Sequence, residues 1–103
     1  MAQTPEAKVK AAVKKILDAE EVWHFSPASN GYGRAGIPDI ICCVKGMFLA
    51  IECKAAKGTV TALQDIEMSA IQKAGGVAVL INNSNIDMVR FWISLLQQAD
   101  GAT

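Results

Sequence analysis

Three stretches of the chain place apolar residues at helical spacing. Stretch 5–18 follows an N-cap threonine and begins with a proline, and stretch 61–74 opens with a Thr-x-x-Gln capping box and ends before two glycines. Stretch 86–98 follows an asparagine cap and is apolar on more than one face. We therefore expect three helices. The residues that carry the pattern in the first two are Val9, Val13, Ile16 and Leu17, and Leu63, Ile66, Ala70, Ile71 and Ala74.

Four shorter apolar runs predict strands between these helices. The run 22–25 is ended by Ser-Pro, and the runs 40–44 and 47–51 are separated only by Lys45-Gly46, the pattern of a hairpin with a two-residue turn. The run 77–81 is wholly apolar and bounded by Gly-Gly and Asn-Asn, which predicts a central strand covered on both faces. A chain of 103 residues has room for one domain, so we expect a single domain over 1–103.

The hairpin brings two carboxylates together. With Lys45-Gly46 as the turn, Asp39 falls directly opposite Glu52, where like charges about 5 Å apart repel by roughly 3 kcal/mol at an effective dielectric of about 20. Lys54 lies on the same strand face as Glu52. We call Asp39, Glu52 and Lys54 the acidic notch, because one ammonium beside two carboxylates leaves a net negative charge that a divalent cation would fill.

Plainer interpretations of the acidic notch stay open from the residues alone. A Glu-x-Lys on an exposed strand is usually a weak surface ion pair, and an aspartate after proline often belongs to a turn. Glu6 lies in line with the apolar stripe of the first helix. Its carboxylate either interacts with the positive end of the helix dipole or supplies a third acidic group to the acidic notch. Gln64 is explained by the capping box, and a role near a metal is the alternative.

Several residues near the acidic notch are candidates for contact with phosphate. Segment 28–35 is the longest polar, glycine-rich stretch, and it is either a plain connector or a loop that becomes ordered on binding a ligand. Its Tyr32 has a ring on which a base can stack, and the planar guanidinium of Arg34 can form two parallel hydrogen bonds to a phosphate, an arrangement we call the phosphate fork. The candidates further along the chain are Lys57, Thr59 and Thr61.

Charge and cysteine content narrow the class of protein. Ten basic and ten acidic residues give a formal net charge of zero, which argues against a bulk electrostatic binder of nucleic acid or membrane but leaves room for a local site. Cys42, Cys43 and Cys53 lie in predicted strands without paired spacing, so we expect buried thiols in a reducing cytoplasm. The single histidine, His24, has no second histidine or thiol at metal-ligand spacing, which favours a structural or surface role over a catalytic one. No apolar run approaches the about 20 residues of a membrane span.

The motif spacing adds a resemblance. Pro38-Asp39, then twelve residues to Glu52 and one more to Lys54, resembles the PD-(D/E)XK nuclease signature. Together with the glutamate of the first helix and the glutamine of the capping box, the stretch 4–79 looks like the VRR-NUC branch, small nucleases of phages and bacteria that are similar to Holliday junction resolvases. The resemblance implies an α/β fold with a mixed sheet, a restriction-endonuclease-like core in the order αβββαβα.

The resemblance also implies a metal-dependent DNA endonuclease, selective for four-way or other branched DNA, that uses Mg²⁺ or Mn²⁺. Lys54 would orient or deprotonate the nucleophile, and Gln64 would hold water or a phosphate. The implied metal ligands are Asp39, Glu52, the backbone carbonyl of Cys53 and, directly or through water, Glu6.

A junction has two strands related by symmetry, so two sites in a two-fold homodimer fit the reaction. The apolar C-terminal helix 86–98 is the expected interface. DNA, branched or duplex, is the expected partner, in the cytoplasm of a bacterial or phage-infected cell. The rival interpretation is a catalytically silent DNA-binding or protein-interaction dimer on the same fold.

Overall fold

The computed structural model describes residues 3–28 and 34–99. The elements follow the predicted order of helix, three strands, helix, strand and helix. They are α1 (Pro5–Ala19), β1 (Trp23–Phe25), β2 (Ile40–Val44), β3 (Met47–Cys53), α2 (Ala62–Lys73), β4 (Val77–Ile81) and α3 (Met88–Ala99).

The strands form one mixed four-stranded sheet in the order β1-β2-β3-β4. β2 and β3 are the predicted hairpin, with Val44 opposite Met47 and Ile40 opposite Ile51. Lys45 has φ 52° and Gly46 has φ 83°, the two positive values that a type I′ turn requires. β3 continues two residues beyond the predicted end, because its parallel pairing with β4 extends to Cys53.

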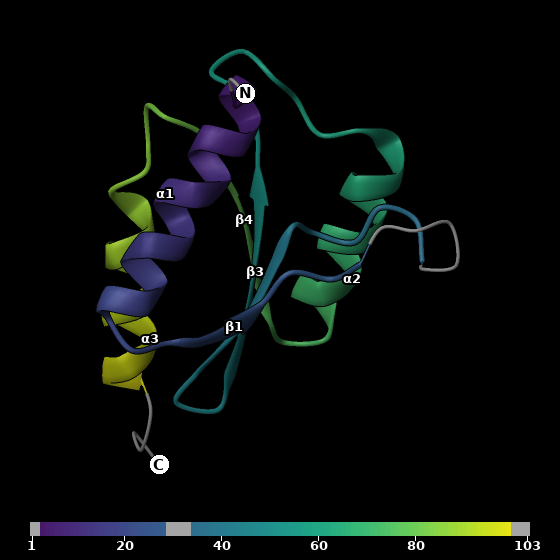
Figure 1. Cartoon of the computed structure of the whole chain (residues 1–103). Coiled ribbons are helices and arrows are strands. Elements are labelled where there is room, and N and C mark those ends of the chain that lie inside the picture. The colour runs from purple at the N-terminus through teal and green to yellow at the C-terminus, as the bar shows by residue number, and fades with distance from the viewer. Residues whose placement is uncertain (1–2, 29–33, 100–103) are drawn as a thin grey trace.

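The helices cover the two faces of the sheet unequally (Figure 1). α1 and α3 lie together on one face and α2 lies on the other. The main core fills the space between α1, α3 and the sheet, and a smaller cluster of Ala50, Met68 and Ala78 lies under α2. The largest fully buried apolar side chains of the main core are Leu17, Ile40, Leu49, Ile51, Ile81 and Ile93.

The central position predicted for β4 is wrong, because β4 is an edge strand beside β3. Its apolar character has another cause. Val77 and Val79 pack against the main core, whereas Ala78 belongs to the cluster under α2. Burial on both faces therefore produced the apolar run at an edge of the sheet.

Most of the apolar stripe that predicted α2 does not face the core. Leu63 is 55% exposed and Ile66 is 62% exposed, whereas Glu67 and Met68 are buried. The inward face is the neighbouring stripe at Gln64, Glu67, Met68 and Ile71, because α2 docks on small residues of the sheet and makes polar contacts there. One such contact is the bond from Gln72 Nε2 to the carbonyl of Ala78 at 3.2 Å.

α3 begins at Met88, two residues later than predicted. Asn85 does not cap the helix, because its amide bonds backwards: Oδ1 accepts from the Asn82 N–H at 2.7 Å and Nδ2 donates to the Leu80 carbonyl at 3.0 Å. The helix buries Val89, Ile93 and Leu96. On its outer side Met88, Phe91 and Leu95 are exposed.

The three cysteines differ in environment. Cys42 and Cys53 are buried as predicted, and burial raises the pKa of each thiol to about 12, so both are inert. The prediction for Cys43 is wrong: it is exposed, opposite Trp23 on the part of the sheet that α2 leaves uncovered. His24 has the structural role expected of it, with Nε2 2.8 Å from Asp18 Oδ1. Among the described helices, none has the length and apolar character needed to cross a membrane.

The orientation of α2 is tested by two truncations. Met68→Ala removes a core side chain and is expected to lower the free energy of unfolding by about 2 to 3 kcal/mol. Leu63→Ala, on the outer side, is expected to change it by about 0.5 kcal/mol or less. Urea denaturation measures both, and a larger loss for Leu63→Ala would show that the helix is turned the other way.

Candidate active site

Asp39 lies at the open end of the hairpin, where the sequence predicts it. It follows the buried Pro38, just before β2 begins, and its Oδ2 accepts a hydrogen bond from the backbone N–H of Cys53 at 2.9 Å. The regular pairing of β2 and β3 ends at Ile40 and Ile51, so Asp39 is the next residue outward, on the same rung as Glu52. The hydrogen bond from the Cys53 N–H to the Asp39 side chain thus takes the place of the next backbone-to-backbone hydrogen bond between β2 and β3.

Glu52 is the most deeply buried charged residue of the described chain, with 2% of its surface exposed. Its Oε2 accepts from Gln64 Nε2 at 2.9 Å and lies 3.4 Å from Lys54 Nζ. Its Oε1 is buried and has no hydrogen-bond partner among the described residues. Burial and the nearby negative charge of Asp39 raise the pKa of Glu52 to about 7, against an opposing effect of Lys54.

Lys54 and Glu6 face each other across the site. Lys54 continues β3, and its backbone N–H donates to the Ile81 carbonyl at 3.0 Å, which fixes the main chain at this point. Its Nζ lies 4.0 Å from Glu6 Oε1, and its side chain is only 13% exposed. Glu6 is in the first turn of α1, so it lies both at a helix N-terminus and beside the acidic notch.

Gln64 combines the two roles that its sequence context left open. Its Oε1 accepts from the Thr61 N–H at 2.9 Å, and its own N–H donates to Thr61 Oγ1 at 3.1 Å, which completes the capping box. Its Nε2 donates to Glu52 at 2.9 Å. One amide therefore caps α2 with its oxygen and holds the acidic notch with its nitrogen.

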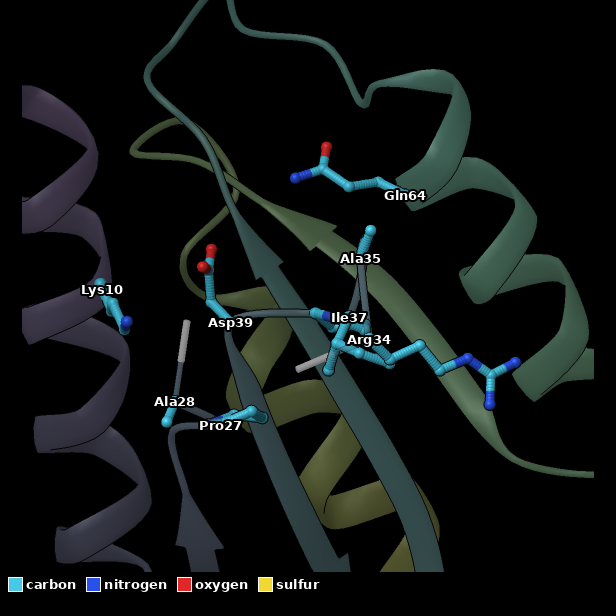
Figure 2. A pocket seen from close by; sticks show the side chains of 10 residues that line it. Lys10, Pro27, Ala28, Arg34, Ala35, Ile37, Asp39 and Gln64 are labelled. Atoms are coloured by element: carbon cyan, nitrogen blue, oxygen red, sulfur yellow. The ribbon is translucent and has the colours of Figure 1, made fainter. Parts of the chain in front are cut away.

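A pocket of about 460 Å³ opens beside the acidic notch, between α1 and α2. In Figure 2 the Asp39 carboxylate lies between Lys10 of α1 and Gln64 of α2. Lys10 is not among the candidates taken from the sequence, although it follows Glu6 by four residues and so shares its side of the helix. Arg34 also lines the pocket, but it extends toward α2 (Figure 2), where its Nε pairs with Glu67.

The other candidates for phosphate contact are placed differently. Lys57, Thr59 and Thr61 are exposed and do not line this pocket, and the Thr61 hydroxyl is used in the capping box. Tyr32 lies outside the described residues. Their contact with DNA stays a prediction.

The acidic side chains fit a hard cation as a pair. Across residues 3–28 and 34–99, no three His, Cys, Asp or Glu side chains gather closely enough to hold a metal, so Glu6 does not complete a triad with Asp39 and Glu52. The unpartnered Oε1 of Glu52 is the atom that a cation would satisfy, because a buried carboxylate oxygen without a partner is costly. Carboxylate oxygens are also the ligands that Mg²⁺ and Mn²⁺ prefer.

A mixed sheet flanked by helices, with Asp, Glu and Lys at the open end of its hairpin, defines a core of the PD-(D/E)XK nuclease type. The model of the archaeal Holliday junction resolvase (Hjc) family matches residues 11–100, and the chain belongs to this family. This match confirms the nuclease superfamily predicted from the motif. A search of curated proteins found no match. The family match begins after Glu6, so the case for that residue depends on its geometry.

The raised pKa of Glu52 predicts how stability varies with pH in the metal-free protein. Because the pKa rises from 4.5 to about 7 on folding, the folded state keeps a proton that the unfolded chain releases between these values. The free energy of unfolding should therefore fall as pH rises through this window, by on the order of 3 kcal/mol.

Thermal unfolding of wild type and Glu52→Gln between about pH 4.5 and about pH 8 measures this effect. The wild-type melting temperature should fall relative to the variant as pH rises, and added Mg²⁺ should raise it more at about pH 8 than at about pH 6, because a cation needs the ionised carboxylate. Parallel pH profiles for the two proteins would contradict the assignment.

Proposed function

We propose that this protein is a metal-dependent endonuclease that hydrolyses phosphodiester bonds in four-way or other branched DNA. The observation that carries the proposal is the buried carboxylate of Glu52, with an unpartnered oxygen, beside Asp39 and 3.4 Å from Lys54. Membership of the Holliday junction resolvase family supports the DNA substrate and its branched form.

Asp39 and Glu52 would hold one or two Mg²⁺ or Mn²⁺ ions. The Cys53 N–H points to Asp39, and the N–H and C=O of a strand residue face the same neighbour, which supports the Cys53 carbonyl as a further ligand. Glu6 would act through a bound water. A divalent cation held there lowers the pKa of water and stabilises charge on the leaving oxygen.

Lys54 is the proposed catalytic residue for proton transfer and charge. Its ammonium is largely buried between two carboxylates, Glu52 and Glu6. As the ammonium it orients the nucleophilic water and offsets charge on the phosphate; the alternative role, accepting the proton of that water, requires Lys54 to be the neutral amine. Gln64 fixes the Glu52 carboxylate through its 2.9 Å bond, and its proposed second role is to hold water or a phosphate oxygen.

DNA contact is proposed around the pocket. Lys10 and Arg34 bring positive charge to its two sides, on α1 and next to α2. The further contacts proposed are Tyr32, Lys57, Thr59 and Thr61. Recognition is through phosphates and the shape of the junction, since no basic recognition helix is evident in the sequence.

The active form is proposed to be a homodimer joined through α3, so that two sites can cut two symmetry-related strands. The exposed Met88, Phe91 and Leu95 on the outer side of this helix support that surface. The Pro38-Asp39 motif and the placement of Gln64 support the VRR-NUC branch, and with it a phage or bacterial origin and a cytoplasmic reaction.

The activity is tested on a labelled four-way junction and a matched linear duplex, with Mg²⁺, Mn²⁺ or EDTA. Wild type is expected to cut the junction only with metal, and Lys54→Ala is expected to lose about 10²-fold or more of the cleavage rate. Lys54→Arg is the matched control: it keeps the charge but cannot accept a proton, so it should bind DNA and cut poorly.

Absence of cutting by folded, metal-loaded wild type would refute the proposed activity. DNA binding unaffected by Lys54→Ala, together with that result, would favour the catalytically silent dimer instead.

The interface is tested by placing a charge on each exposed apolar surface. Phe91→Lys on α3 should convert a dimer into a monomer, because a charge buried in an apolar contact is not solvated. Phe48→Lys, on the sheet surface, should leave the dimer intact. Sedimentation equilibrium measures both masses, and a wild-type monomer, or a monomer only for Phe48→Lys, would contradict the α3 interface.

A further inference from the structure

Glu67 is a buried carboxylate that the proposed hydrolysis does not use. It is 8% exposed and lies on the inward face of α2, one turn after Gln64. A carboxylate in such a position is costly unless it is paired. An apolar residue would pack well at this position between α2 and the sheet. The presence of a charged glutamate therefore points to a positively charged partner.

That partner is Arg34, which among the described residues forms an ion pair through its Nε. Its Nε pairs with Glu67 Oε2, while the Arg34 side chain as a whole is 74% exposed and that of Glu67 is 10% exposed. The pair is therefore asymmetric, with a buried, fixed acid and an arginine open to solvent. A guanidinium has five N–H donors in a planar fork, so pairing through Nε leaves the donors of the terminal nitrogens for a phosphate.

The main chain around Arg34 is held as well. Gly36 has φ 83°, and a Cβ at this position would meet the Leu63 carbonyl oxygen at 2.5 Å. The segment after Arg34 therefore lies directly on the first turn of α2, where only glycine fits. Asp39 follows Gly36 by only three residues. The contact of Gly36 with Leu63 therefore fixes the main chain of Arg34 relative to the acidic notch.

We propose that Glu67 is a positioning residue that holds Arg34 as a clamp for a DNA phosphate flanking the one that is cut. The inference depends on the proposed nuclease function. In Figure 2 Arg34 extends toward α2 and away from Asp39, so its fork lies at the α2 side of the pocket. The scissile phosphate belongs at the acidic notch, and a fork at this side contacts a neighbouring phosphate of the same strand.

If Glu67 positions Arg34, removing Glu67 changes the affinity for DNA in the direction opposite to that expected from charge repulsion alone. Removing an acidic residue near DNA ordinarily leaves binding unchanged or strengthens it. If Glu67 positions Arg34, Glu67→Ala instead weakens binding of the junction about tenfold, the loss expected for one charge-assisted contact. Asp65→Ala removes an exposed acid from the same helix and is the matched control, with unchanged or tighter binding.

The experiment measures junction binding by fluorescence anisotropy in EDTA over a range of salt concentrations, with Glu67→Ala, Arg34→Ala, the double variant and Asp65→Ala. Arg34→Ala should weaken binding about tenfold and reduce the salt slope by about one. The double variant should be no weaker than Arg34→Ala alone, because both changes remove one contact. Glu67→Gln, which keeps an acceptor for Nε and preserves the side-chain shape, should retain most of the affinity.

Additive losses in the double variant, or tighter binding by a folded Glu67→Gln, would overturn the inference. Single-turnover cleavage with Mg²⁺ then separates positioning from general damage: Glu67→Ala should raise the protein concentration needed for half-maximal rate and leave the saturating rate unchanged. A lower saturating rate with unchanged binding would equally refute the clamp. Because binding is measured without metal, a wild type that binds junctions but never cuts would refute the nuclease function separately.

Discussion

Burial of one carboxylate governs this structure. Glu52 lies at the end of β3 with 2% of its surface exposed, and a charge removed from water costs several kcal/mol unless neighbours replace the lost hydration. Gln64 and Lys54 do so at one oxygen, and the other oxygen has no hydrogen-bond partner among the described residues. The raised pKa of the Glu52 carboxyl has the same cause, because its neighbours replace only part of the hydration that burial removes. If the proposed cation binds there, protein stability and metal affinity are coupled through this one side chain.

Three local features place side chains around that carboxylate. A type I′ turn sets the register that places Asp39 beside Glu52, and the first turn of α1 presents Glu6. The capping box of α2 orients Gln64. Local structure at a turn and at two helix starts thus positions chemistry that comes from distant parts of the chain.

The parts predictable from sequence were those set by local patterns: the element order, the hairpin register and the capping box, and through them the positions of Asp39, Glu52, Lys54 and Gln64. The inward face of α2 was not predictable, because two stripes of similar spacing compete and packing against the sheet chose the more polar one. The edge position of β4 and the pairing of Arg34 with Glu67 likewise depend on contacts between distant segments, which periodicity does not encode.

The parallel pairing of β3 with β4 also affects when the site can form. Lys54 is held by the Ile81 carbonyl, a partner that enters the chain only after the whole of α2 has been made. During synthesis the hairpin can close early, but Glu52 then lacks Gln64, and Lys54 lacks its main-chain support. Parallel strands form late because a long crossover must be ordered first. A nascent chain is thus expected to be unable to cut nucleic acid until β4 has emerged and docked.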